Sequence, residues 1–157
     1  MRKRLVAPLQ QGRAPPDQDW LHLEELAEVE LTSEDTAHPI EAALTPGGTS
    51  GWRAAGPGTQ TIRLLFARPQ PLRRIWLSFK ETHVERTQEY ALRWSPDGGQ
   101  SFRDIVRQQW NFSPHGTTSQ TQDHHVELPA VTVLELTITP DTSGGPALAS
   151  LAQLRLA

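Results

Sequence analysis

The chain has 157 residues with a net charge of −3, and 36% of these residues are hydrophobic. This length predicts one domain with a single core, and a pI near 6.0 argues against the basic field that nucleic-acid binding relies on. Because the chain has no cysteine, disulfides, thiolate nucleophiles and cysteine-ligated zinc are excluded.

The first segment, residues 1–19, contains several prolines, glutamines and aspartates. It predicts an extended leader ahead of a single domain over residues 20–157. Its basic start is followed by polar residues before any apolar run that is long enough for a secretion signal. No run in the chain approaches the roughly 18 apolar residues that span a bilayer. We therefore expect a soluble, cytoplasmic protein without a membrane span.

The next elements expected are a strand, a short helix and a break. The leucines among glutamates in residues 21–30 fit either a short helix or the approach to a strand, and we favour a strand over residues 27–32. Pro39 followed by good helix formers predicts one or two helical turns over residues 38–44. The glycine-rich run 45–51 ends this helix.

From residue 61 onward, apolar residues alternate with polar ones, which predicts short strands. A turn is expected at Pro69-Gln70-Pro71 and another at Ser95-Pro96-Asp97-Gly98-Gly99, after which residues 102–110 pair back as a hairpin. The expected strands are residues 61–66, 74–79, 89–94, 102–110, 126–128, 131–139 and 149–156. Together with the early strand they number about eight, which predicts an all-β, antiparallel jelly-roll β-sandwich with one short helix. The polar stretch 113–123 is expected to be the longest late loop and a candidate binding site.

The order of these features resembles the discoidin, or coagulation factor 5/8 C-type, domains and the related carbohydrate-binding modules, which are galactose-binding-like. The segment Tyr90–Phe102 is the most specific part, because it is similar to the family's strand, Ser-x-Asp-Gly turn and aromatic-led return strand. The resemblance runs from about residue 27 to the end and implies a jelly-roll sandwich. Many members carry Asp-Gly in a loop that holds calcium, whereas this chain has Pro46-Gly47-Gly48. Calcium binding is therefore not predicted, although Asp35 and backbone carbonyls remain candidate ligands.

A second, local resemblance concerns Trp52-Arg53-Ala54-Ala55-Gly56 followed by Thr61-Ile62. This segment is similar to the amino-terminal domain of the animal DNA single-strand-break repair scaffold, which has the same fold. Relatives with this fold bind sugars, lipids, proteins or nicked DNA, so the fold alone does not decide the ligand.

The chain carries no convincing catalytic or metal-binding pattern. In a strand, the neighbours His124 and His125 point to opposite faces and cannot chelate one ion together. Ser95 lacks the Gly-x-Ser-x-Gly elbow of a nucleophile, and the glycine run 47–51 lacks the lysine of a phosphate-binding loop. No spacing marks out a catalytic pair among Glu81, Glu85, Glu89, Asp97 and Asp104. We expect no enzyme, no metal and no cofactor.

Sugar recognition needs an aromatic ring for the C–H face of the sugar and planar polar groups for its hydroxyls. Trp110, Asn111 and His115 supply both types within one short segment, and His83 and Arg86 supply polar groups in another loop. We predict that these five residues form a ligand site at one end of the sandwich. The alternative is that Trp110 packs into the core, as expected of Trp52, Trp76 and Trp94.

The function predicted from the sequence is noncatalytic binding, with a carbohydrate or glycoconjugate as the favoured ligand. The alternative is an intracellular protein–protein interaction or scaffold domain. Exposed edge strands would also permit a homodimer.

Overall fold

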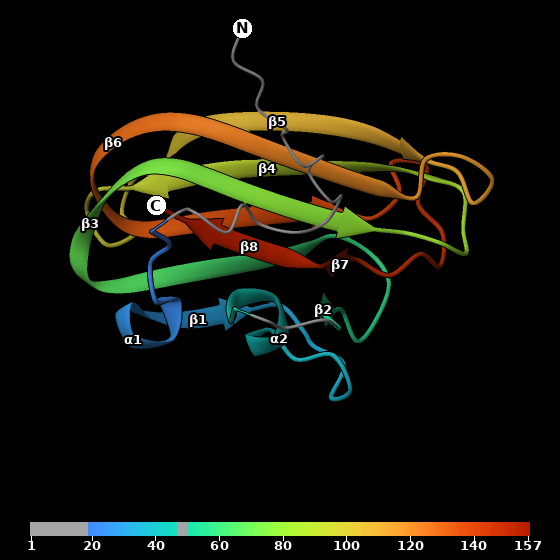
Figure 1. The fold of residues 1–157 in the computed structure, drawn as a ribbon, viewed down its shortest axis with the longest axis horizontal. Helices are drawn as coiled ribbons and strands as arrows, with labels where there is room; N and C mark the ends of the chain where they lie inside the picture. Colours follow the sequence, from blue (N-terminus) through green and yellow to red (C-terminus); the bar gives the residue numbers. More distant parts are fainter. Residues whose placement is uncertain (1–18, 47–49) are drawn as a thin grey trace, which may run out of the picture.

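The computed structural model describes residues 19–46 and 50–157 and shows two facing β-layers (Figure 1). The helices are α1 (Leu23–Leu26) and α2 (Glu41–Leu44). The strands are β1 (Ala27–Leu31), β2 (Trp52–Arg53), β3 (Gln60–Lys80), β4 (Arg86–Ser95), β5 (Arg103–Phe112), β6 (Ser119–Thr139), β7 (Ser150–Leu151) and β8 (Gln153–Leu156). All strand pairs among them are antiparallel. The predicted all-β sandwich is confirmed.

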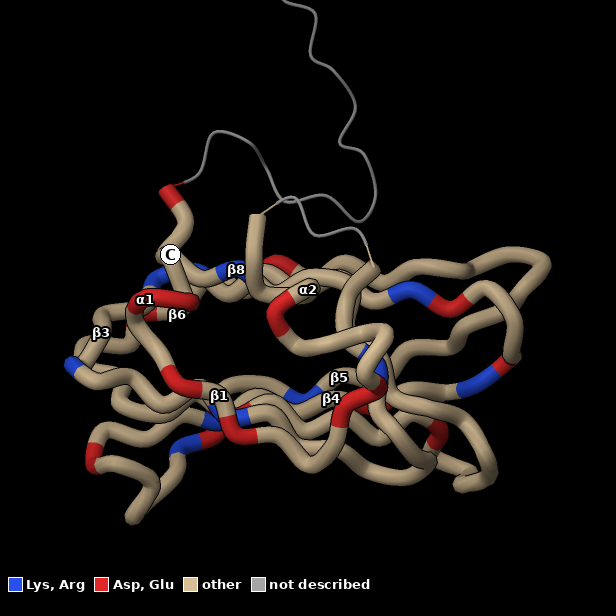
Figure 2. The backbone as a smooth tube through the Cα atoms, turned by 90° about the horizontal axis from the view of Figure 1, so that it is seen from below, with Lys and Arg blue, Asp and Glu red and all other residues tan. Residues whose placement is uncertain are grey.

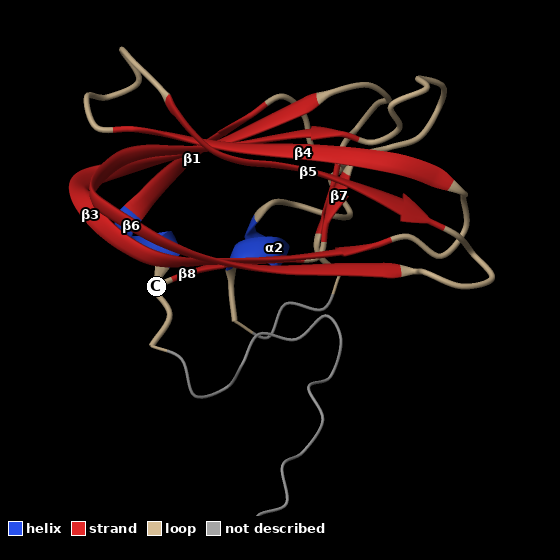
Figure 3. Cartoon of the chain, turned by 90° about the horizontal axis from the view of Figure 1, so that it is seen from above, coloured by secondary structure: helices blue, strands red, loops and turns tan. Residues whose placement is uncertain are grey.

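Two long strands, β3 and β6, join the layers, because each has 21 residues and bends to serve both (Figure 3). Residues 60–65 of β3 pair with residues 133–138 of β6, and residues 74–80 of β3 pair with residues 119–125 of β6. The first half of β3 and the last part of β6 lie in one layer, with the strand order β1-β3-β6-β4-β5. In the other layer, β8 pairs with the second half of β3. The sandwich is therefore one continuous sheet folded over.

The chain does fold back near Pro69-Gln70-Pro71, but through a bend within one strand, so the predicted tight turn between two separate strands is wrong. These residues lie inside β3, which bends from one layer to the other (Figure 1) and shifts register with β6 between Leu65 and Arg74. Proline has no N–H to donate, so it is tolerated at irregular positions of this kind. The buried side chain of Leu72 continues the core through the bend.

The prediction of a long loop over residues 113–123 is also wrong. Only residues 113–118 connect β5 to β6, since β6 already begins at Ser119. The loop is short because Ser119 and Gln120 pair with Lys80 and Phe79 of β3.

The core lies between the layers and is built from alternate strand residues. Trp52 and Trp94 belong to it, and Trp76 is buried too, as expected. The largest fully buried side chains are Trp52, Tyr90, Phe79, Phe112, Ile62, Leu64, Leu72, Ile75, Leu77, Leu92, Leu134 and Leu136. Each of the two helices in the described residues has four residues, too few to span a bilayer.

The predicted turn between β4 and β5 is confirmed and is held by one carboxylate. Asp97 accepts hydrogen bonds from the Ser101 and Ser95 side chains, and these bonds lower the pKa of Asp97 to about 2. Gly98 and Gly99 follow with φ of 75° and 95°, a region that disfavours side chains with a Cβ. The hairpin that follows brings the end of β5 back beside the start of β4.

Candidate functional site

A pocket of about 190 Å³ opens at the end of the sandwich where β3 ends and β4 begins. This end, at the right of Figure 1, is called the loop end below. The pocket is lined by His38, Ser50, Trp52, Arg53, Lys80, Glu81, Thr82, His83, Ser150, Leu151 and Ala152. Its walls therefore come from four separate segments of the chain.

Backbone hydrogen bonds hold these segments together. β2 pairs with β7, and the backbone N–H of Arg53 donates to the carbonyl of His38 at 3.2 Å. Ala152 N–H donates to the Ser78 carbonyl at 2.8 Å, which ties this region to β3. Gly51 has φ 66°, and a Cβ there would lie 2.6 Å from the Leu151 carbonyl oxygen, so this close approach requires glycine. The pocket is thus built on fixed backbone.

The loop after β3 is anchored by Arg86, whose side chain is 0% exposed. Its Nε donates to Glu81 Oε1 at 2.8 Å, and its Nη1 donates to the Pro140 carbonyl at 2.6 Å. Burial raises the pKa of Glu81, but the bonds from Arg86 and from the His83 backbone outweigh that effect and lower it. Glu81 is therefore ionised, and its charge is balanced from beneath the pocket.

Two further charged side chains line the pocket, Arg53 and Lys80, and both are exposed cations. His83 is exposed there too, and His38 is half-buried. Asp35, next to the pocket, lies 3.5 Å from His38 Nδ1. Because Arg86 balances Glu81, the cations outnumber the free carboxylates. This pocket favours an anionic or polar ligand.

No aromatic ring is offered for stacking by the described residues that line the pocket, apart from the histidines. Trp52 is the one Trp, Tyr or Phe among them, and it is 1% exposed. Its Nε1 donates to the Ser33 carbonyl at 3.1 Å. Ligand binding here must depend on hydrogen bonds and charge more than on a stacking ring.

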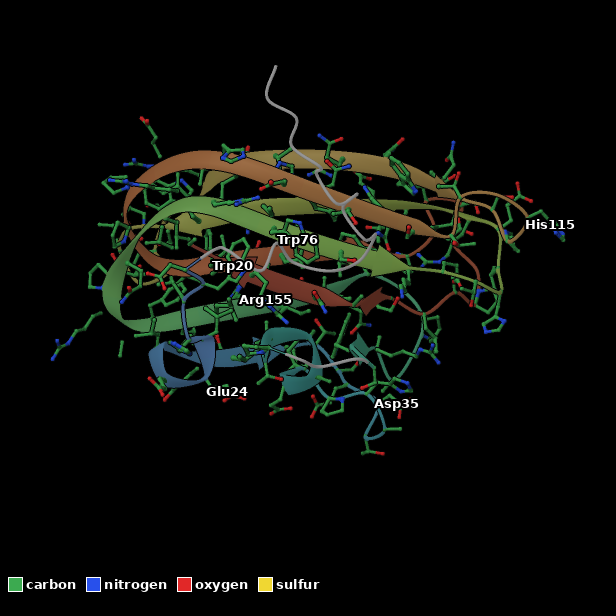
Figure 4. All side chains as sticks on the ribbon, viewed as in Figure 1. Trp20, Glu24, Asp35, Trp76, His115 and Arg155 are labelled. Atoms are coloured by element: carbon green, nitrogen blue, oxygen red, sulfur yellow. The ribbon has the colours of Figure 1, made fainter. Side chains whose placement is uncertain are left out.

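Of the five predicted site residues, His83 alone lines this pocket, and Arg86 lies buried below it. Trp110 points to the inner face of β5 and packs against the core, as the alternative interpretation expected. Asn111 points to the opposite face, where its Oδ1 accepts a hydrogen bond from Thr87 at 2.8 Å. His115 is exposed in the connection between β5 and β6 (Figure 4). The structure does not bring the five side chains together.

His38, Arg53 and Lys80 also line the pocket but were not predicted from the sequence. Lys80 directly precedes the segment that contains His83 and Arg86, so that residue could have been included. His38 and Arg53 carry no local signal, since they reach the pocket through the pairing of β2 with β7 and the contact between residues 35–38 and Arg53.

The neighbours His124 and His125 lie on opposite faces of β6. As the alternation predicts, His124 faces inward, where its Nε2 lies 2.7 Å from the Tyr90 hydroxyl, and the side chain of His125 is 74% exposed. Among the described residues, no group of three or more His, Asp or Glu side chains could hold a metal ion.

Comparison with solved structures identifies the fold. A family 32 carbohydrate-binding module from Clostridium perfringens, solved with galactose, is 15% identical with a TM-score of 0.64, covering 87% of this chain and 96% of that one. The chain has the fold of these carbohydrate-binding modules. A second module from the same organism, solved with GalNAc-β-1,3-galactose, is 17% identical with a TM-score of 0.66, covering 88% and 99% of the two chains.

A third carbohydrate-binding module of family 32, solved with 4,5-unsaturated mannuronic acid, is 14% identical with a TM-score of 0.61, covering 84% of this chain and 95% of that one. No protein-family model and no curated protein matches the chain. At these identities the likeness concerns the fold. It confirms the β-sandwich fold that the resemblance implied. The likeness to the repair scaffold stays a prediction.

Proposed function

We propose that this chain is a noncatalytic carbohydrate-binding module whose ligand binds in the pocket at the loop end. The observation that carries the proposal is the pocket itself, in which Arg53, Lys80, His83 and His38 converge from separate segments. Support comes from the fold, since the similar modules were solved with saccharides. Glu81 is the one carboxylate among the lining residues, so this pocket lacks the carboxylate pair of a glycosidase.

The charge of the pocket favours a saccharide that carries a carboxylate. Arg53 and Lys80 can each donate charge-assisted hydrogen bonds to such a group, and these bonds are stronger than those to a neutral hydroxyl. Without an exposed aromatic ring in the lining, a neutral sugar has only hydroxyl contacts. We therefore infer that uronic acids bind better than neutral hexoses.

The test uses galacturonic acid and galactose, which differ at one carbon, in calorimetric titrations of the full chain. We expect galacturonic acid to bind more tightly, and added salt to reduce the difference. Arg53→Ala and Lys80→Ala should each weaken galacturonic acid binding about tenfold or more, from the loss of one charge-assisted bond. His115→Ala, which changes an exposed histidine outside the pocket lining, is the matched control and should bind normally.

Each other outcome has a distinct meaning. Equal affinity for both sugars would contradict the preference for a carboxylate but not the proposal that sugars bind in the pocket. Loss of binding in His115→Ala but not in Arg53→Ala would move the site to the connection between β5 and β6. No binding of either monosaccharide, or of any oligosaccharide on a glycan array, would contradict carbohydrate binding.

A further inference from the structure

A second depression lies between α1, β1 and α2. We call it the β1 groove. It has a volume of about 390 Å³ and is lined by Leu23, Glu24, Ala27, Val29, Leu31, Glu34, Ile40, Glu41 and Leu44. Its floor is apolar, since Leu23, Ile40 and Leu44 are buried core residues. Its rim is acidic.

One wall of the β1 groove is the edge of a sheet. β1 is the terminal strand of its layer, and β3 is the single strand with which it pairs in the part of the chain that the structure describes. Along β1, Ala27, Val29 and Leu31 are partly buried and alternate with the exposed Glu28 and Glu30. An edge of this kind presents backbone N–H and C=O groups that an extended segment can pair with.

The other wall is held in place by Arg155, which is buried beside α2. Its Nη1 and Nη2 donate to the carbonyl oxygens of Ala43 and Thr45, each at 2.8 Å. These bonds tie the end of α2 to β8, because Arg155 belongs to β8. The β1 groove therefore has two fixed walls and is a feature of the folded chain.

The charged side chains that α1, β1 and α2 contribute around the β1 groove are all acidic. Residues 19–46 contain eight Asp and Glu and no Lys or Arg, although the whole chain has 18 acidic and 15 basic residues. Figure 2 shows these acidic positions along α1, β1 and α2. Arg63 of β3 lies opposite Glu30 and shares Glu135 with Arg93, so Glu30 has a cation beside it. The acidic side chains of residues 19–46 outnumber this cation. The rim thus carries a negative field that favours a basic partner.

We propose that the β1 groove binds an extended segment of a partner protein in which basic residues alternate with apolar ones, added as a strand to β1. The apolar side chains of that segment contact the floor, and its basic side chains lie beside Glu28 and Glu30. This role goes beyond saccharide binding and matches the protein-interaction alternative that the sequence left open.

A second copy of this chain is the wrong occupant. Pairing two β1 edges antiparallel would bring the glutamates of one copy close to those of the other, and like charges facing each other across strands are destabilising. The homodimer that exposed edges would permit is therefore not expected at this edge.

The experiment titrates the full chain with a fluorescent synthetic peptide that alternates lysine with valine. We expect saturable binding that weakens with salt and shifts the backbone amide NMR signals of β1. The double variant Glu28→Lys/Glu30→Lys should weaken binding about tenfold or more. The matched control Glu85→Lys/Glu127→Lys makes the same charge change at exposed positions elsewhere and should bind nearly as wild type.

Two further peptides separate strand addition from charge attraction alone. A lysine–valine peptide with methylated backbone nitrogens on one edge keeps its charge but cannot pair, and it should lose binding. A glutamate–valine peptide should not bind. Equal binding of the methylated peptide, or equal binding by Glu28→Lys/Glu30→Lys, would overturn the proposal. Glu28→Lys/Glu30→Lys should bind saccharides as wild type does. A failure of the peptide-binding proposal is therefore distinguishable from a failure of the proposed saccharide binding.

Discussion

At the scale of single residues, the fold constrains the charge of His124. This side chain is partly buried, and its Nε2 lies 2.7 Å from the hydroxyl of Tyr90. Burial lowers the pKa of His124, and the nearby Asp123 opposes this only in part. The same burial raises the pKa of Tyr90. The folded protein therefore favours the neutral imidazole.

This preference predicts a loss of stability in mild acid. Below the ordinary histidine pKa of 6.5, the unfolded chain binds a proton at His124 that the folded chain does not. The free energy of unfolding therefore falls as the pH drops through this range and rises as the pH increases. His124→Gln should remove this part of the pH dependence and cost about 1 kcal/mol at neutral pH through the altered hydrogen bond.

Urea unfolding of wild type and His124→Gln at pH 7.5 and at pH 5.5 measures the effect. The difference between the two proteins cancels the other five histidines. His125→Gln is the control, since the side chain of His125 is 74% exposed. If His124→Gln loses as much stability on acidification as wild type does, the neutral, buried state of His124 is contradicted.

The period of a strand explains which residue predictions succeed. Alternation placed His124 and His125 on opposite faces, and the structure agrees. The same rule separates Trp110 from Asn111 once β5 extends to Phe112, so those two neighbours could not serve one site from a strand. The positions of His38 and Arg53 in the pocket could not be predicted, because they depend on tertiary pairing rather than on local sequence spacing.

At the scale of elements, the connection between β3 and β4 depends on Arg86. Its guanidinium joins Glu81 of this connection to Pro140 beyond β6 and lies 4.9 Å from the ring centroid of Phe112. Arg86→Lys keeps the charge but cannot reproduce the forked bonds to several acceptors. We expect it to lower the free energy of unfolding by about 2–4 kcal/mol and to weaken saccharide binding by loosening Glu81 and His83.

Thermal melting and calorimetric titration of Arg86→Lys test both effects. Arg107→Lys is the control, since Arg107 forms an exposed ion pair with Glu89 and should shift stability by less than about 1 kcal/mol. Wild-type stability in Arg86→Lys would contradict the anchoring role. Normal stability together with lost binding would instead indicate direct ligand contact by Arg86, as the sequence prediction had it.

Strands with alternating apolar residues could be predicted from the sequence, whereas the polar first part of β6 could not. Tyr90, Leu92 and Trp94 show the period plainly, and β4 contains them. The first part of β6 has Gln120, Gln122 and His124 at inward positions, where Gln120 accepts a bond from Gln88. Because its inner face is polar, hydrophobic spacing could not distinguish this strand from a loop.

At the scale of the whole molecule, the shared strands β3 and β6 make the two layers one unit. Neither layer can unfold without releasing part of the other, so we expect a single cooperative transition. Urea unfolding followed by tryptophan fluorescence and by far-ultraviolet circular dichroism should give the same midpoint. Leu136→Ala, in the core, should lower both midpoints together at a cost of about 2–5 kcal/mol. Separate midpoints for the two probes would contradict this coupling.

The two ends of the described domain meet at one place. The backbone N–H of Leu21 donates to the carbonyl of Leu156 at 2.8 Å, and this contact lies at the end of the sandwich away from Lys80 and His83 (Figure 1). A polypeptide fused after Ala157 would therefore emerge at the end of the sandwich opposite the pocket at the loop end. Surface immobilisation through the C-terminus would leave that pocket facing the solution.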